Sequence, residues 1–149
     1  MEFKLDDAYF MKKALIEAET AFENGEVPIG AVIVVQGRII ARGYNQTEQL
    51  NDVTAHAEML AITSAANFLG GKYLYDCTLY VTLEPCQMCA GALYWSQIPR
   101  IVFGARDPQR GYSASGTKLH PKTKVKGGVM EKEAEALLKR FFIQKRNLN

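Results

Sequence analysis

Residues 78–89 read TLYVTLEPCQMC and join a strand pattern to the beginning of a helix. The run from Thr78 to Leu83 is rich in β-branched and aromatic residues, which favour buried strands. Pro85 suits a helix start, and residues three apart, such as Cys86 and Cys89, share one helix face. This segment therefore predicts an α/β unit with two thiols near the end of a strand.

A second segment, residues 54–69, has apolar residues at helical spacing up to a pair of glycines. Thr54 is the expected N-cap of this helix. His56 and Glu58 then fall in its first turn. We expect the two helix starts to bring His56 and the two cysteines to one metal ion, with a carboxylate beside it.

These groups predict an open zinc site. Zinc favours mixed imidazole and thiolate ligands, and a catalytic zinc has three protein ligands where a structural one has four. The remaining histidine and cysteine, His120 and Cys77, lie outside both motifs, so three ligands are expected: His56, Cys86 and Cys89. Helix dipoles favour the thiolate form of both cysteines. Glu58 is not needed as a ligand and is expected to exchange protons with a metal-bound water.

Each residue alone has a simpler interpretation. The Cys-x-x-Cys pair could be a redox pair. His56 could be a structural histidine, and Glu58 could only complement the helix dipole. Cys77 is expected to be a small buried residue that opens the strand. The combination is more specific than any of its members.

The pattern H-x-E followed by P-C-x-x-C resembles that of zinc-dependent nucleobase and nucleoside deaminases. More specifically, the chain resembles the bacterial tRNA-specific adenosine deaminase family over nearly its whole length. The similar stretches are residues 26–31, 54–59, 79–93 and 102–107, together with the C-terminal helix. The resemblance implies an enzyme, a zinc-dependent hydrolase with one Zn²⁺ per subunit, that converts the wobble adenosine of tRNA to inosine.

The expected architecture is one α/β domain over residues 1–149, since this length suits a single core. Alternating strands and helices predict a central sheet with helices on both faces. The resemblance implies a three-layer α/β/α fold with a mixed five-stranded sheet. The expected helices cover residues 8–22, 54–69, 86–96 and 131–146, and the expected strands cover residues 29–35, 38–44, 78–83, 100–104 and part of 125–130.

The resemblance also assigns residues to the reaction. Glu58 would take a proton from the zinc-bound water and deliver protons to the ring nitrogen and the leaving amine. The backbone amide of Ala57 would hold the base, and Asn45 would contact the nucleoside. The pocket wall would consist of Val27, Pro28 and Ile29. Asn45 could instead be a turn residue, and the three wall residues could be ordinary core and a strand entry.

Residues 108–117, PQRGYSASGT, depart from the family pattern, although Asp107 before them is retained. Asp107 is expected among the substrate-binding residues. The way in which flanking anticodon nucleotides are held is not predicted, because Asp107, Tyr112 and Ser113 could instead form a capped turn.

The formal net charge is only +2, so no general basic field indicates RNA. Basic residues nevertheless gather near aromatic ones late in the chain, which suits a single-stranded loop bound by stacking and by phosphate contacts. The expected RNA contacts, on the tRNA anticodon loop, are Lys122, Lys124, Lys126, Phe142, Lys145 and Arg146. The alternative is a solvated edge strand and a helix C-terminus that favours cations.

No apolar run approaches the ~20 residues of a membrane span. The first residues lack a signal-peptide pattern, so no membrane association and a cytoplasmic location are expected. The resemblance implies a homodimer whose subunits jointly form each substrate groove. Residues 93–98 are a candidate interface strip, or else the buried end of the zinc-bearing helix.

Two competing functions remain open from the sequence. The first is a deaminase of a free base or nucleoside, such as guanine or cytosine, with the same metal chemistry. The second is a non-enzymatic module stabilised by zinc. The spare carboxylate Glu58 and the missing fourth ligand count against the second.

Overall fold

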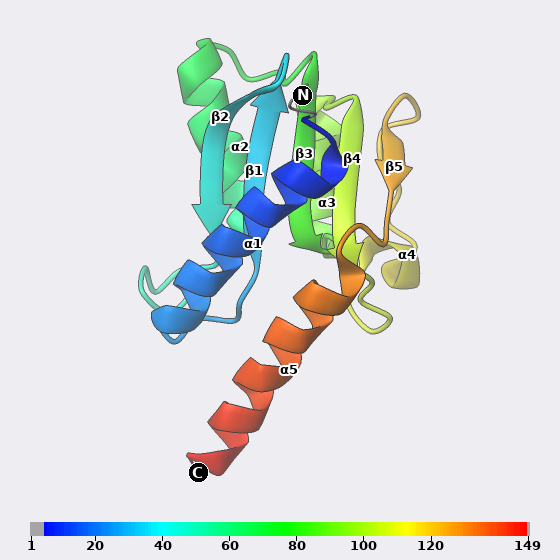
Figure 1. The fold of residues 1–149 in the computed structure, drawn as a ribbon. Coiled ribbons are helices and arrows are strands. Elements are labelled where there is room, and N and C mark those ends of the chain that lie inside the picture. The colour runs from blue at the N-terminus through cyan, green and yellow to red at the C-terminus, as the bar shows by residue number, and fades with distance from the viewer. Residues whose placement is uncertain (1–4, 149) are drawn as a thin grey trace, which may run out of the picture.

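A computed structural model describes residues 5–148, in which a five-stranded mixed sheet has the order β2-β1-β3-β4-β5 (Figure 1). β1 is antiparallel to both of its neighbours, whereas β3, β4 and β5 run parallel. The strands are β1 (Gly30–Val35), β2 (Arg38–Tyr44), β3 (Cys77–Leu83), β4 (Arg100–Ala105) and β5 (Lys124–Lys126). The predicted mixed five-stranded sheet is thereby confirmed.

Helices cover both faces of this sheet (Figure 1). They are α1 (Asp7–Glu23), α2 (Ala57–Leu69), α3 (Gln87–Ser96), the short α4 (Tyr112–Ser115) and α5 (Glu131–Asn147). Successive strand residues point to opposite faces. Tyr80 and Val102 accordingly pack with α1, while Leu79 and Ile101 pack with the apolar sides of α2 and α3. The fold is therefore the predicted three-layer α/β/α arrangement.

Two glycines allow helices to approach the first hairpin closely. A Cβ atom on Gly30 would lie 2.1 Å from the carbonyl oxygen of Ala14 in α1, and one on Gly43 would lie 2.4 Å from that of Ala57 in α2. These distances are far below van der Waals contact, so only glycine fits there. The contact at Gly43 fixes the first turn of α2, where the predicted metal site begins.

Helix α2 begins later than predicted. His56, not Thr54, is the N-cap residue, and it makes no side-chain capping hydrogen bond. The hydroxyl and the backbone N–H of Thr54 instead donate to Oδ1 of Asp52, at 2.7 and 2.8 Å. Thr54 therefore stabilises the turn before α2 and does not cap the helix.

The last strand is shorter than the predicted segment, Val125 to Met130, because β5 begins one residue earlier and covers only Lys124–Lys126. Gly127 lies against the ring of Phe103, where a Cβ would come within 2.4 Å of a ring carbon, and Gly128 has a φ of 85°. The regular strand pairing ends before these glycines, although the backbone N–H groups of Gly128 and Val129 still donate to the carbonyl oxygens of Gly104 and Phe103 in β4. None of the helices within residues 5–148 has the length and apolarity needed to cross a membrane.

Candidate active site

The three predicted ligands lie together where two helices begin. His56 is the N-cap residue of α2, Cys86 is the N-cap residue of α3, and Cys89 follows in the first turn of α3. Nδ1 of His56 is 3.6 Å from each of the two Sγ atoms, and all three ligand atoms lie within 4.8 Å of one another. The strand-to-helix connections therefore place one imidazole and two thiols around a single point.

The spacing of these atoms fits zinc. Zn–N and Zn–S bonds of about 2.05 and about 2.3 Å at a tetrahedral angle require a nitrogen–sulfur separation of about 3.6 Å. The observed separations have that value. Within the described part of the chain, no further histidine, cysteine or acidic side chain joins these three at metal-ligand spacing. A tetrahedral ion held by them would therefore have one position without a protein ligand.

The two thiols differ in acidity. A hydrogen bond from Cys89 lowers the pKa of Cys86 to about 4, although burial opposes the shift. The same hydrogen bond, together with burial, raises the pKa of Cys89 well above its usual range. Cys86 is therefore the more acidic of the two thiols, and a metal ion that binds both sulfur atoms would displace any proton they carry.

Glu58 lies in the first turn of α2 and is 4 % exposed. Burial raises its pKa to about 7, and the neighbouring Cys86 thiolate acts in the same direction. The nearby Cys89 thiol and His56 act in the opposite direction on the pKa of Glu58, but more weakly than burial. Glu58 is thus a buried acid beside the metal ligands that is not itself part of the ligand set.

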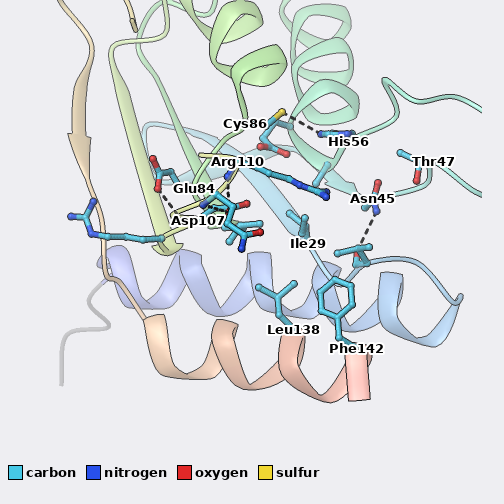
Figure 2. Close-up of a pocket in the computed structure, with 16 residues that line it drawn as sticks. Ile29, Asn45, Thr47, His56, Glu84, Cys86, Asp107, Arg110, Leu138 and Phe142 are labelled. Atoms are coloured by element: carbon cyan, nitrogen blue, oxygen red, sulfur yellow. Dashed lines mark hydrogen bonds between the residues drawn. The ribbon is translucent and has the colours of Figure 1, made fainter. Parts of the chain in front are cut away.

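A cavity of about 550 Å³ opens over these residues (Figure 2). Its lining comes from the ends of strands, the starts of α2 and α3, and one side of α5. The lining residues are Val27, Ile29, Asn45, Thr47, His56, Ala57, Glu58, Leu83, Glu84, Cys86, Arg106, Asp107, Gln109, Arg110, Leu138 and Phe142. The volume is in the range of small-molecule sites, and it accommodates a nucleoside.

Most of the residues to which the resemblance gives a role in substrate binding lie in the wall of this cavity. Asn45, Ala57 and Asp107 do so, as do two of the wall residues, whereas Pro28 is buried and is not among the lining residues. The carboxylate of Asp107 also accepts backbone N–H bonds from Gln109 and Arg110, at 3.2 and 3.0 Å. Asp107 therefore forms the capped turn that was the alternative interpretation, and it faces the cavity as well.

Asn45 has an unsatisfied acceptor. Its side-chain N–H donates to the carbonyl oxygen of Val27 at 3.4 Å, but its Oδ1, within residues 5–148, is a buried oxygen without a hydrogen-bond partner. Buried polar atoms are rarely left unpaired. An O–H or N–H group of a bound molecule would satisfy this oxygen.

Several lining residues were not predicted from the sequence. Thr47 lies on the connection after β2; Leu83 and Glu84 lie at the end of β3; Arg106, Gln109 and Arg110 lie after β4; and Leu138 lies on α5. Only their place in the chain could have indicated these residues. The segments that follow the ends of the parallel strands β3 and β4 reach the same edge of the sheet as the metal ligands.

The residues proposed for RNA contact fall into two groups. Phe142 lines the cavity, and Lys145 and Arg146 continue along α5 in an adjoining groove with Leu138 and Ile143. The lysine-rich group lies elsewhere. In β5, Lys124 is paired with Arg100 at the first residue of β4, whereas the cavity lies beyond the last residue of β4.

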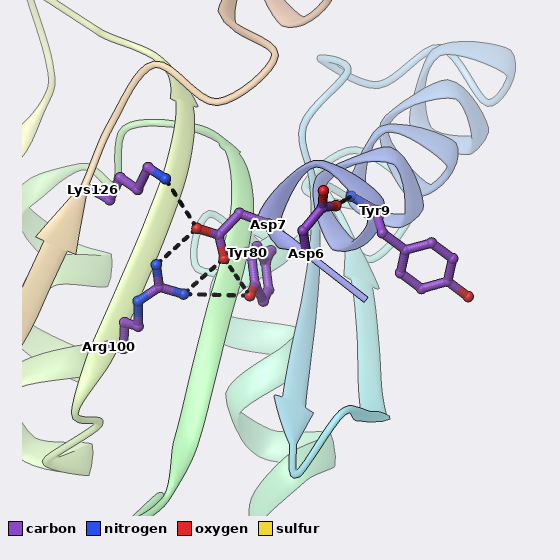
Figure 3. A network of polar contacts seen from close by, with 6 residues as sticks. All are labelled: Asp6, Asp7, Tyr9, Tyr80, Arg100 and Lys126. Carbon is purple, nitrogen blue, oxygen red and sulfur yellow. Dashed lines mark hydrogen bonds and ion pairs between the residues drawn. The ribbon is translucent and has the colours of Figure 1, made fainter. Parts of the chain in front are cut away.

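Lys126 has a partner within the chain (Figure 3). Its Nζ is 3.2 Å from Oδ2 of Asp7, whose carboxylate also binds both terminal nitrogens of Arg100 at 2.8 Å and accepts the Tyr80 hydroxyl at 2.8 Å. The hydrogen bond from Arg100 is the main reason that the pKa of Asp7 lies well below its usual range. This network joins the start of α1 to three strands.

In the candidate interface strip, residues 93–98, buried residues alternate with partly or fully exposed ones. Leu93 and Ile98 are fully buried in the core of the same chain, and Ser96 is buried as well. Trp95, by contrast, is 76 % exposed. The inner side of the strip therefore belongs to the core, and its outer side carries one large exposed aromatic residue.

The fold and the site together define a class of protein. A three-layer α/β/α domain with one imidazole, two thiols and a spare buried carboxylate at the starts of two helices is the arrangement of zinc-dependent deaminases. The sequence agrees, because residues 4–105 match the model of the cytidine and deoxycytidylate deaminase zinc-binding region.

Individual relatives narrow the class. The tRNA-specific adenosine deaminase of Agrobacterium fabrum is 47% identical over 144 residues, which cover 93% of this chain and 95% of that protein. The tRNA-specific adenosine deaminase of Aquifex aeolicus is 48% identical over 145 residues, with 93% and 95% covered. A solved structure from studies of A-to-I editing by tRNA:A34 deaminases has a TM-score of 0.80 at 45% identity, covering 87% of this chain and 99% of that chain.

The chain belongs to the cytidine and deoxycytidylate deaminase family and, within it, to the tRNA-specific adenosine deaminases. It is an enzyme of the zinc-dependent hydrolase class.

Proposed function

We propose that this protein converts the wobble adenosine in the anticodon loop of a tRNA to inosine by hydrolytic deamination. The observation that carries the proposal is the set of three metal ligands with Glu58 beside them at the base of a nucleoside-sized cavity. Relatives that cover nearly the whole chain are tRNA-specific adenosine deaminases, and a related solved structure comes from work on the wobble position of transfer RNA. A tRNA substrate would place the enzyme in the cytoplasm.

The ligands His56, Cys86 and Cys89 would hold one zinc ion per subunit. A zinc ion supplies a nucleophile at neutral pH, because it lowers the pKa of water. Glu58 would take one proton from the attacking water and pass it to the ring nitrogen of adenine. It would then take the second proton of the same water, from the new hydroxyl on C6, and pass it to the amine, which leaves as ammonia. The burial of Glu58 keeps bulk solvent away from its carboxylate.

The cavity would hold the nucleoside by both polar and apolar contacts. The free Oδ1 of Asn45 would accept a hydroxyl or N–H group of the substrate. The backbone N–H of Ala57, in the first turn of α2, has no partner within its helix and would donate to the base. Val27 and Ile29 would pack against the flat faces of the nucleoside, with Pro28 supporting the segment behind them.

The side of α5 next to the cavity would bind the rest of the anticodon loop. Phe142 would stack with a neighbouring base, while Lys145 and Arg146 would contact phosphates. Lys122, Lys124 and Lys126 would add a weaker, long-range attraction, because β5 pairs with the half of β4 remote from the cavity. Lys126 would contribute least, since it already pairs with Asp7.

Two charge-matched variants test that surface. Replacing Lys145 and Arg146 with alanine should reduce the salt dependence of hairpin binding by about 0.7 per lost phosphate contact. Replacing Lys122 and Lys124 with alanine removes the same charge and should change the slope less. Equal slopes for the two variants would contradict the assignment of the phosphate contacts to α5.

We also propose that the enzyme acts as a homodimer, as the resemblance implies. Trp95, with Tyr94 packed edge-on against it, is a large exposed aromatic surface on the outer side of α3. Sedimentation equilibrium of the wild type and of Trp95→Ser should show a weaker dimer for the variant. A wild-type protein that remains monomeric would contradict this part of the proposal.

The decisive experiment is an inosine assay on an anticodon stem-loop with a wobble adenosine, read by nucleoside mass spectrometry. Glu58→Ala, which should retain zinc, serves as the blank. A hairpin in which guanosine replaces the wobble adenosine is the substrate control. Inosine formation that depends on Glu58 supports the proposal, and an inert hairpin contradicts it.

Free-base deamination is the second candidate function. It is favoured by the similarity of the fold to guanine deaminase from Nitrosomonas europaea, with a TM-score of 0.81 at 25% identity, covering 94% of this chain and 86% of that chain. Parallel reactions with adenosine, guanine and cytosine distinguish the two. Turnover of guanine or cytosine with an inert hairpin would favour the second candidate.

A further inference from the structure

Two buried carboxylates lie outside the metal centre, and neither takes part in the proposed chemistry. Glu26 is 1 % exposed and Glu84 is 3 % exposed. Burial of a carboxylate is costly unless hydrogen bonds compensate for the lost water. Each of the two accepts hydrogen bonds from a connecting segment that contributes a wall of the cavity.

Glu84 holds the segment after β4. Its Oε1 accepts the backbone N–H of Asp107 at 3.0 Å, and its Oε2 accepts the backbone N–H and the hydroxyl of Ser113 at 3.2 and 2.5 Å. The carboxylate thus ties both ends of a seven-residue segment to the end of β3. Between these ends lie Gln109 and Arg110, which line the cavity.

Gly111 lets this segment close over the carboxylate. A Cβ on Gly111 would lie 2.5 Å from Cδ of Glu84, so no larger residue fits without displacing the carboxylate. The next backbone N–H, that of Tyr112, donates to the carbonyl oxygen of Pro85 at 2.8 Å. The segment that departs from the family pattern is therefore fixed to the residues immediately before the metal ligand Cys86.

Glu26 holds the opposite wall. Its Oε1 accepts the backbone N–H of Glu48 at 3.1 Å, and its Oε2 accepts that of Gln49 at 2.7 Å. These residues directly follow Asn45 and Thr47, which line the cavity. Figure 2 shows Asn45 and Thr47 on one side of the cavity and Asp107 on the other.

We infer that Glu26 and Glu84 are positioning residues that hold the two facing walls of the cavity, so that its width is set before substrate binds. The inference rests on the proposed function for the identity of the substrate, a nucleotide within an RNA loop. Glu84 sets the position of Asp107 and Arg110, and Glu26 sets that of Asn45 and Thr47. Neither residue touches the reacting atoms.

The replacement that tests this arrangement is carboxylate to amide. In Glu84→Gln, one acceptor oxygen becomes an NH₂ group that faces N–H or O–H donors, so at least one hydrogen bond is lost at nearly constant volume. Glu26→Gln does the same on the other wall. The two variants serve as matched controls for each other, because each alters one wall and leaves the other intact.

The first measurement is amide hydrogen exchange in the free, zinc-loaded protein. Glu84→Gln should speed exchange at Asp107 and Ser113 by about tenfold or more and leave Glu48 and Gln49 unchanged. Glu26→Gln should show the reverse pattern. Uniformly faster exchange over the whole chain in both variants would overturn the inference, because it would indicate a general loss of stability.

The second measurement is steady-state kinetics on the stem-loop, with zinc content determined for every variant. Glu84→Gln should raise KM by about tenfold, since a bond to a charged group is lost, while kcat at saturation stays within about threefold. Ser113→Ala, which removes one of the three donors and little volume, should have a smaller effect in the same direction and provides the test if Glu84→Gln does not fold.

The outcomes separate this inference from the proposed function. If the stem-loop is inert and a free base is turned over, the same exchange pattern with a KM effect on that base still supports the positioning role. Unchanged exchange at residues 107–113, or a KM within twofold of the wild-type value despite faster exchange, overturns it.

Discussion

Asp7→Asn tests the network that joins the start of α1 to β3, β4 and β5. Asp7 receives two hydrogen bonds from Arg100 and one from the Tyr80 hydroxyl, each at 2.8 Å. A hydrogen bond to a charged group contributes about 1.5–3 kcal/mol to stability when it is shielded from solvent. The Arg100 side chain is 36% exposed, so solvent screening removes a large part of that contribution. We expect the substitution to lower the free energy of unfolding at pH 7 by about 2 kcal/mol, or Tm by about 6 °C.

The effect should depend on pH in a defined direction. The pKa of Asp7 is lowered from 3.8, mainly by the hydrogen bond from Arg100. A carboxyl group whose pKa is lower in the folded state contributes stability above its unfolded pKa and loses it as the pH falls through the folded value. The difference between wild type and variant should therefore be constant from about pH 7 to about pH 5 and shrink below about pH 4.

Urea denaturation at pH 7, 5 and 3 measures this difference. The matched control is Asp6→Asn, which removes the same charge from the neighbouring residue. Asp6 caps α1 by accepting the Tyr9 N–H at 2.9 Å, and asparagine caps helices about as well, so a loss of less than about 0.5 kcal/mol is expected. A loss for Asp7→Asn that is equal at pH 7 and pH 3, or no larger than that of the control, would refute the reasoning.

The remaining predictions concern the site. Glu58→Gln should lower kcat by about 10²–10⁴-fold with zinc retained, and substantial turnover would remove Glu58 from the mechanism. Gly43→Ala should lower the free energy of unfolding by about 1–3 kcal/mol and weaken zinc binding, because its Cβ would press on the backbone of Ala57. The control is Gly91→Ala on α3, where the added Cβ meets open space, and urea titration should show no loss of stability for it. Asn45→Ala should lower kcat/KM by about tenfold or more, and an unchanged value would show that its Oδ1 does not meet the substrate. Chelation of the metal should abolish turnover and lower Tm, and added zinc should restore both.

The metal site was predictable because its information is local. His56 and Glu58 lie in one helix turn, and Cys86 and Cys89 lie in another, so each half of the site follows from a short motif and the periodicity around it. The sheet was predictable for the same reason, since buried strands carry a continuous apolar pattern. The three residues of β5 are all exposed, so no such pattern marked its position.

Several residues that line the cavity followed from the resemblance, but the hydrogen bonds that hold its walls were not predictable, because they join residues far apart in the sequence. Glu84 meets Ser113 across 29 positions, and Lys126 meets Asp7 across 119. A glutamate before a proline has no periodicity that would indicate burial. The error in the predicted N-cap at Thr54 has a different, local cause, because a competing acceptor, Asp52, lies two residues earlier in the turn.

The sheet order has a consequence for how the chain folds. All three metal ligands lie at the starts of α2 and α3, so a zinc ion closes a loop of 30 residues between His56 and Cys86. β1 must instead pair with β3 across a longer stretch of chain, which contains both β2 and α2. We therefore expect the segment around the metal to close first during folding. Docking of the β1–β2 hairpin against β3 should be the slower step, because it joins residues that are farther apart in the sequence.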